Sequence, residues 1–184
     1  LVAGESLALV SDAGTPLLSD PGARLVRAAI DAGVVVTPIP GPSALLAALA
    51  GAGLDARRFT FFGFLARKGK ERTETIAAVV ELGHTAVLYE APARIGNTLR
   101  ALAEAGAADR QGVVARELTK QYEEFRRGTV GELAAYYEEH EARGEIVLLV
   151  QGATPVVADE DSLRARAAEL RASGKSARDV TQDL

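Results

Sequence analysis

The segment Ser11-Asp-Ala-Gly-Thr-Pro-Leu-Leu-Ser-Asp-Pro-Gly22 decides how the first part of the chain folds. A continuous apolar run, residues 7–10, comes directly before it, and apolar residues at helical spacing, residues 25–30, follow it. These patterns predict a loop between a buried strand and a helix. A second apolar run, residues 34–36, completes a strand, helix, strand order, which predicts a parallel pair with a right-handed crossover.

Local signals predict where the helices of this region begin and end. Asp20 is placed to cap the first helix, with Pro21 in its first turn, and Gly33 is expected to end it. A second rigid loop, Thr37–Ala44, has prolines on both sides of a glycine and leads into residues 44–50. That stretch is apolar on nearly every side, so we expect a buried helix.

The rest of the chain alternates strand and helix patterns, which predicts an α/β fold with a mixed or parallel sheet covered by helices. We expect three parts. Residues 1–56 are the remainder of an N-terminal α/β domain, residues 57–153 form a C-terminal α/β domain, and residues 154–184 begin a helical appendage. Predicted strands are residues 59–64, 85–89, 113–116 and 145–150, and predicted helices are residues 71–82, 94–105, 130–140 and 163–170.

Composition restricts the possible functions. The 184 residues are 48% hydrophobic and 25% charged, with a formal net charge of −4, as expected for a globular protein. The absence of cysteine excludes disulfides, thiolate zinc sites and cysteine nucleophiles, and with two histidines we expect no metal site. Apolar runs are shorter than the roughly 20 residues of a membrane span, and no secretory signal is evident, so we expect a cytoplasmic protein without membrane contact.

The two loops at the start of the chain are candidate ligand sites. In open α/β sheets, ligands bind at the carboxyl ends of strands, and helix N-termini attract carboxylates and phosphates. Ala13 and Gly14 would let a ligand approach the backbone, Asp12 offers a carboxylate, and Ser43 offers a hydroxyl. For either loop alone, the alternative is that proline and glycine only form a turn.

Further motifs follow these loops along the chain in a fixed order, and together they resemble the tetrapyrrole methylase family. Within that family they are most similar to the enzymes that methylate ribosomal RNA of the small subunit, over about Glu5 to Gly152. The motifs are Ser11-Asp-Ala-Gly-Thr-Pro with Asp20-Pro-Gly, Pro40-Gly-Pro-Ser-Ala44, Gly63-Phe-Leu, Tyr89-Glu-Ala-Pro-Ala-Arg94, and Arg116-Glu-Leu-Thr-Lys120 with Glu123-Glu124.

The resemblance implies two α/β domains that bind S-adenosylmethionine between them. It implies methylation of a ribose 2′-hydroxyl of a cytidine in 16S ribosomal RNA, by a homodimer. The alternatives are a tetrapyrrole C-methyltransferase acting on a precorrin or uroporphyrinogen, or a fragment without catalytic activity. The family's first strand and its glycine-rich loop are not found in this sequence. We therefore expect a fragment that lacks the N-terminal strands and the C-terminal end.

The resemblance also implies which residues meet the cofactor and carry the reaction. The methyl donor is already reactive, so the protein mainly aligns the groups and helps the hydroxyl lose its proton. Candidates for the proton step are Glu90, Glu117 and Lys120, although the charges of residues 116–120 could also belong to a solvated strand edge. Expected cofactor contacts are Asp12, Ala13, Gly14, Leu17, Ser43, Ala44, Glu90 and Leu118.

A basic stretch around residues 57–72 is interleaved with phenylalanines. Basic groups can neutralise phosphates and exposed aromatic rings can stack on bases, so this stretch favours RNA binding. For the phenylalanines of residues 59–64, however, we expect positions in the core. The residues expected to contact RNA are Arg67, Lys68, Lys70, Arg72, Arg94 and Arg116.

Overall fold

The computed structural model describes residues 4–10, 15–17, 21–39, 41, 43–154, 160–173 and 175–176. The chain divides into two compact units, Leu1–Ala153 and Thr154–Leu184. Helix α6, Glu160–Ala172, lies in the second unit and covers the helix predicted over residues 163–170. All other elements belong to the first unit, and the division of that unit near residue 56 stays a prediction.

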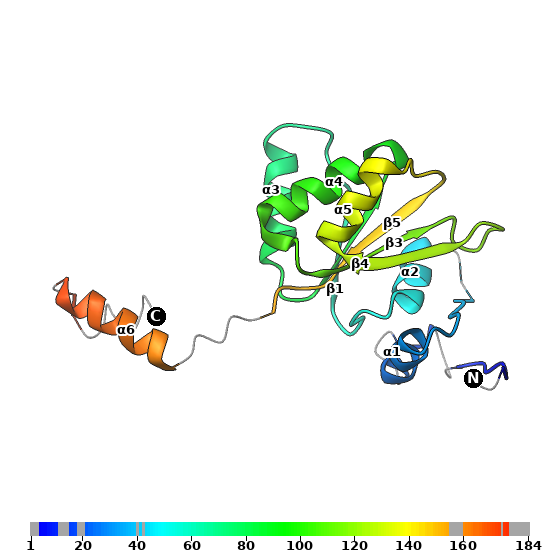
Figure 1. The fold of residues 1–184 in the computed structure, drawn as a ribbon, viewed down its shortest axis with the longest axis horizontal. Coiled ribbons are helices and arrows are strands. Elements are labelled where there is room, and N and C mark those ends of the chain that lie inside the picture. The colour runs from blue at the N-terminus through cyan, green and yellow to red at the C-terminus, as the bar shows by residue number, and fades with distance from the viewer. Residues whose placement is uncertain are drawn as a thin grey trace. The chain divides into compact units, whose positions relative to one another are not determined.

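A mixed five-stranded sheet forms the centre of the first unit (Figure 1). Its strand order is β1-β2-β5-β3-β4. β1 and β2 are parallel, whereas β5 runs antiparallel to both β2 and β3, and β3 runs antiparallel to β4. The predicted α/β class with a mixed sheet is confirmed. The strands are β1 Phe59–Phe64, β2 Thr85–Glu90, β3 Gln111–Arg116, β4 Glu124–Thr129 and β5 Ile146–Val150.

Helices cover both faces of this sheet. Successive side chains of a strand point to opposite faces, so each face has its own core cluster. Leu88 of β2 belongs to a core cluster with residues of α3 (Lys70–Glu81), α4 (Ile95–Leu102) and α5 (Val130–Glu139). The neighbouring Val87 belongs to a second cluster with α2 (Ala44–Ala52). We call these the α4 face and the α2 face. A short 3-10 helix, η1 (Pro92–Arg94), precedes α4, and a π-helical turn, η2 (Ala103–Ala107), follows it.

Helix α2 is the buried helix that the sequence predicts. The Ser43 hydroxyl caps it by accepting the Leu46 amide at 3.4 Å, and Gly53 ends it in the left-handed conformation with φ 79°. Gly51 faces the Phe125 ring so closely that a Cβ there would overlap the ring. The guanidinium of Arg127 on β4 donates to the carbonyls of the last turn of α2. The start of the chain is thereby joined to the sheet.

Helix α1 spans Ala23–Asp31, and its predicted start was wrong. Gly22, with φ 122°, is the residue before the first turn, and no side chain caps the helix. The helix therefore begins beyond the positions at which Asp20 would cap it and Pro21 would occupy its first turn. The predicted end is confirmed, because Gly33 has φ 70° and its amide donates to the Ile30 carbonyl at 2.9 Å.

The two strands predicted before and after α1 are not formed. Residues 7–10 and 34–36 have no strand pairing among the residues that the structure describes, although both are apolar. A strand needs a partner for its backbone groups, and an apolar run supplies none by itself. Val10 and Val35 are 81% and 86% exposed. Together with α1 and α2, these segments line an apolar hollow of about 480 Å³.

Other boundaries differ less from expectation. Strand β4 was missed because its sequence, Glu-Phe-Arg-Arg-Gly-Thr, is mostly polar, yet it pairs with β3 along its whole length. The helix predicted over residues 94–105 is divided into η1, α4 and η2, with a kink at Gly106. Among the described residues, no helix is long and apolar enough to cross a membrane.

Candidate functional site

Three of the five sequence motifs, those at the ends of β1, β2 and β3, meet at one edge of the sheet. Glu90 at the end of β2 pairs in register with Ile146 of β5, which pairs with Arg116 at the end of β3, which pairs with Glu124 at the start of β4. Phe64 at the end of β1 pairs with the neighbouring residue of β2. The loops that follow β1, β2 and β3 therefore leave the sheet from this side, which we call the motif edge.

Glu90 lies on the α4 face, where its side chain is fully buried. Its carboxylate accepts the Thr98 hydroxyl at 2.7 Å and the Ala91 amide at 2.8 Å. The Arg94 guanidinium lies 3.2 Å from the carboxylate and forms an ion pair with it. A buried carboxylate needs such partners to remain charged. This geometry makes Glu90 an anchor for the turn after β2, and its predicted catalytic and cofactor roles remain untested.

The loop after β3 is conformationally strained. Glu117 and Thr119 have φ of 49° and 69°, a region that residues other than glycine rarely adopt. Between them, Leu118 is buried in the cluster of the α2 face. Such strain is concentrated at functional sites when the surrounding structure maintains it. The alternative interpretation of residues 116–120 as a solvated strand edge therefore fits only Arg116, because β3 ends there and residues 117–120 form a turn.

Two of the proposed proton-transfer residues are paired with each other in this loop. The Lys120 ammonium lies 3.0 Å from the Glu117 carboxylate and 3.1 Å from that of Glu145. The Glu145 amide and then Lys120 hold the pKa of Glu117 below its ordinary value. Hydrogen bonds to Glu117 and Glu145 raise the pKa of Lys120. At neutral pH the pair is therefore ionised, a carboxylate beside an ammonium.

The predicted cofactor residues of the first two loops are described only in part. Asp12, Ala13 and Gly14 lie outside the described residues. Leu17 is buried and has φ 78°. Across the described part of the chain, the non-glycine residues with positive φ are Leu17, Glu117 and Thr119, so all of them lie in the motif loops. Ser43 and the exposed Ala44 form the start of α2.

The predicted RNA-contacting residues fall into two places. Five of them lie on the loops after β1 and β2 or on the first turn of α3. Of these, Lys68 is exposed and Lys70 lies 3.3 Å from Glu74 in an i,i+4 ion pair. Arg116 is separate, because it lies on β3. The group of five is Arg67, Lys68, Lys70, Arg72 and Arg94.

Arg116 is part of a paired network on the α4 face. Its Nε donates to Glu124 at 2.5 Å, and Arg126 donates to the other oxygen of the same carboxylate at 2.7 Å. The Arg126 guanidinium also lies 3.7 Å from the centre of the Tyr136 ring. Partial burial raises the pKa of Glu124, but the two arginines outweigh it and the pKa is lowered. This network holds β3 and β4 against α5.

The sequence predicts core positions for the phenylalanines of β1, and this prediction is wrong for two of them. Phe59 and Phe62 pack against the two core clusters, but Phe61 and Phe64 are 45% and 68% exposed. Their rings lie 4.8 and 5.5 Å from that of Tyr89. The reason is that β1 is an edge strand, so part of its α2 face has no covering helix. An exposed aromatic cluster results at the motif edge.

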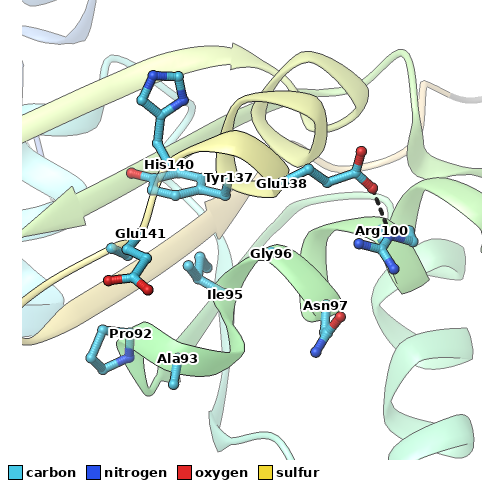
Figure 2. Close-up of a pocket in the computed structure, with 11 residues that line it drawn as sticks. Pro92, Ala93, Ile95, Gly96, Asn97, Arg100, Tyr137, Glu138, His140 and Glu141 are labelled. Carbon is cyan, nitrogen blue, oxygen red and sulfur yellow. Dashed lines mark hydrogen bonds and ion pairs between the residues drawn. The ribbon is translucent and has the colours of Figure 1, made fainter.

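A mixed-charge hollow of about 460 Å³ lies between α4 and the end of α5 (Figure 2). Glu138 of α5 reaches toward Arg100 of α4, at 2.8 Å, and His140 and Glu141 lie on the opposite side. In the described part of the chain, no group of three or more histidine, aspartate and glutamate side chains is placed to hold a metal ion. This hollow therefore combines charges of both signs without a metal cage.

Two residues of the site escaped the sequence analysis. Thr98, which donates to Glu90, belongs to none of the motifs, and neither does Asn97, which lies beside Arg94. The available signal was their position in the first turn of a predicted helix that directly follows the Tyr89–Arg94 motif. Thr98 is four residues from Arg94, a spacing that places both on one side of a helix.

A mixed α/β sheet with sequence motifs on the loops at the ends of its strands is the arrangement to compare with known protein families. A sequence profile of the Tetrapyrrole (Corrin/Porphyrin) Methylases matches residues 1–134. The chain belongs to this family.

Individual relatives are more specific. A protein of Xylella fastidiosa named ribosomal RNA small subunit methyltransferase I is 49% identical over 166 residues, which is 89% of this chain and 59% of that protein. A Bacillus subtilis protein of the same name is 45% identical over 161 residues, or 88% and 55%. The chain thus spans between half and two thirds of the length of these two relatives.

A solved structure shows the same fold. A cobalt precorrin-4 methyltransferase of cobalamin biosynthesis superimposes with a TM-score of 0.50, over 67% of this chain and 58% of that one. The two sequences are 19% identical, so the likeness concerns the fold alone.

Proposed function

We propose that this chain is part of an S-adenosylmethionine-dependent methyltransferase that modifies a ribose 2′-hydroxyl of a cytidine in 16S ribosomal RNA. The observation that carries the proposal is its identity of 45–49%, over 88–89% of the chain, to proteins named for methylation of small-subunit ribosomal RNA. The convergence of the motif loops at one edge of the sheet supports it.

The cofactor is proposed to lie on the α2 face of the motif edge. Leu118 belongs to the same cluster as α2, whose first residues are among the predicted cofactor contacts. The strained residues on either side of Leu118 support this location, as does the strained Leu17 in the first motif loop. The proposed contacts are Asp12, Ala13, Gly14, Leu17, Ser43, Ala44 and Leu118. The predicted contact of Glu90 is not part of this proposal, because its buried side chain lies on the α4 face.

The proposed reaction is an in-line displacement in which the ribose oxygen attacks the methyl carbon and the sulfonium leaves as a thioether. The sulfonium supplies the driving force, so the protein must chiefly align the oxygen, methyl carbon and sulfur. In this proposal Glu117 accepts the hydroxyl proton, and its ion pair with Lys120 orients it. The lowered pKa of Glu117 makes it a weak base, so the alignment of the reacting groups carries most of the proposed rate enhancement.

The proposed RNA surface combines the basic loop with the exposed aromatic cluster. Phe61 and Phe64 offer ring faces at the motif edge, and unpaired bases stack on such faces. The basic residues of the loops after β1 and β2 can neutralise backbone phosphates. Arg116 is the weakest member of the predicted set, because Glu124 already compensates its charge.

We further propose that the protein acts as a homodimer in the cytoplasm, where ribosomal subunits are found. The exposed apolar side chains of residues 7–10 and 35–39 supply surface that a partner or a further segment can cover. Size-exclusion chromatography with light scattering measures this directly. A monomer at micromolar concentration would contradict the homodimer.

Calorimetric titration with S-adenosylmethionine tests the proposed cofactor. It is carried out on this chain and on a version extended to the length of the relatives. Heat of binding from the extended version is expected. No heat from either version would contradict the methyltransferase proposal. The substrate is tested separately by methyl transfer to small ribosomal subunits.

A further inference from the structure

An arginine-lined hollow of about 390 Å³ lies beside the motif edge, between the loop after β1 and the start of α4. We call it the arginine hollow. Its lining residues come from three segments, and none of them is acidic. They are Arg67, Arg72, Arg94 and Asn97.

Arg94 is held in place by the backbone and by Glu90. Its Nη2 donates to the Leu65 carbonyl at 2.6 Å and to the Ala66 carbonyl at 3.2 Å. Its Nε lies 3.2 Å from the buried Glu90 carboxylate. The hydrogen bonds use the two N–H groups of Nη2, Nε faces Glu90 in an ion pair, and Nη1 has no bond to the described residues. Arg94 is therefore preorganised with donors to spare.

Arg72 is attached to the same framework. Its Nη1 donates to the Ala66 carbonyl, which also accepts from Arg94, and its Nη2 donates to the Thr98 hydroxyl, both at 3.4 Å. Thr98 in turn donates to Glu90. Two guanidinium groups are thus attached to one carbonyl and share the buried Glu90 network. Holding like charges together in this way is unfavourable unless an anion compensates them.

The charge of the hollow is not balanced by the protein. Arg67 is exposed and has no hydrogen-bond or ion-pair partner within the described part of the chain. Among the described residues, the carboxylate that forms an ion pair with one of these arginines is Glu90, whose side chain is fully buried and paired with Arg94. Three guanidinium groups against one carboxylate leave two positive charges. Planar guanidinium forks match the oxygens of a phosphate.

The neighbouring mixed-charge hollow does not share this property. Asn97 lines both hollows, but the second contains Glu138 and Glu141, and its arginine, Arg100, is paired with Glu138 (Figure 2). Positive charge without compensation is therefore specific to the arginine hollow. Arg100 provides a matched control for Arg67. Both are exposed arginines, and Arg100 lies near the arginine hollow, on α4 with Asn97, but is paired with Glu138.

We propose that the arginine hollow binds one phosphodiester group of the RNA backbone. Arg67, Arg72 and Arg94 compensate its negative charge, and the Asn97 side-chain amide donates a hydrogen bond to it. This inference rests on the proposed function. Glu90 and Thr98 act as positioning residues, because they touch the arginines and not the phosphate. The site orients the substrate strand along the motif edge.

The test measures binding of a short fluorescein-labelled single-stranded RNA by anisotropy over a series of KCl concentrations. The protein is the version extended to the length of the relatives, with Arg67→Ala compared with Arg100→Ala. Arg67→Ala is expected to weaken binding about tenfold and to reduce the slope of log K against log salt by about 0.7, as for loss of one phosphate contact. Arg100→Ala should change neither by more than measurement error.

Two other results would overturn the inference, and they differ in what they say about the proposed function. If the unsubstituted protein methylates small ribosomal subunits but Arg67→Ala binds RNA as tightly as Arg100→Ala, the phosphate site is wrong and the proposed function stands. If the unsubstituted protein neither binds nor methylates RNA, both are wrong.

Discussion

Replacing Glu90 distinguishes an anchoring carboxylate from a catalytic base. As an anchor, Glu90 stabilises the fold by accepting hydrogen bonds from Thr98 and Ala91 and by its ion pair with Arg94. A carboxylate held ready for proton transfer is instead expected to be strained or poorly paired, so that its loss costs little stability. The two roles therefore predict opposite effects of Glu90→Gln on the free energy of unfolding.

The expected magnitude follows from these contacts. Glu90→Leu leaves the Ala91 amide and the Thr98 hydroxyl without their acceptor and Arg94 without its counter-charge. Removal of one partner of a buried pair costs about 3–5 kcal/mol, and the lower end applies because Arg94 is 25% exposed. In Glu90→Gln, the amide oxygen can still accept from Ala91, and the Thr98 hydroxyl can turn to accept from the new amide nitrogen, so the main loss is the charge-assisted part and the ion pair with Arg94. We expect about 1–2 kcal/mol for that variant.

Urea unfolding followed by circular dichroism measures both variants, and the slope against urea must stay constant for the comparison to hold. Glu138→Gln is the control, because its carboxylate forms a surface pair with Arg100 and should change stability by less than about 1 kcal/mol. If Glu90→Gln is as stable as the unsubstituted protein or more stable, the anchoring role is refuted. The catalytic prediction for Glu90 would then gain support.

Three further predictions concern packing, pH and RNA. Gly96→Ala should lower the free energy of unfolding by about 1–3 kcal/mol, the usual cost of overpacking, because a Cβ there would lie 2.9 Å from a backbone carbonyl oxygen of α5. Gly83→Ala, where nothing lies within 4 Å, is the control in thermal unfolding, and equal melting temperatures would contradict the prediction. The lowered pKa of Glu124 means that its pair with Arg116 contributes stability above its ordinary pKa of 4.5, and this is lost as pH falls through the folded value. Stability measured from pH 6 down to about 3 should therefore fall less steeply for Glu124→Gln, and parallel curves would argue against this contribution. Phe64→Ala should weaken single-stranded RNA binding by about 1–3 kcal/mol in anisotropy titrations with no change in salt slope, and an unaltered affinity would remove the ring from the RNA surface.

The parts of the fold that the sequence predicts are those whose signal is local. β2 and β5 are continuous apolar runs between polar segments, and α2 is apolar with a serine before it and a glycine after it. β4 was missed because it is stabilised by tertiary contacts. Arg126 contacts the Tyr136 ring of α5, and Arg127 donates to a carbonyl of α2, so this polar strand is half-buried.

The errors near the start of the chain have the same origin. Residues 7–10 and 34–36 are as apolar as the strands of the sheet, but a strand also requires a backbone partner, and their sequence does not specify one. At the site, the order of the motifs predicts that their loops belong together. It does not predict that Glu90 points to the α4 face, because the strand alternation that decides this depends on the register with β5.

The most direct measurement is transfer of a tritiated methyl group from S-adenosylmethionine to small ribosomal subunits that lack the modification. It uses the version extended to the length of the relatives and maps the labelled nucleotide. The proposed function predicts label in 16S ribosomal RNA, on the ribose 2′-oxygen of a cytidine. Label in an added uroporphyrinogen or precorrin, with none in the RNA, would contradict it.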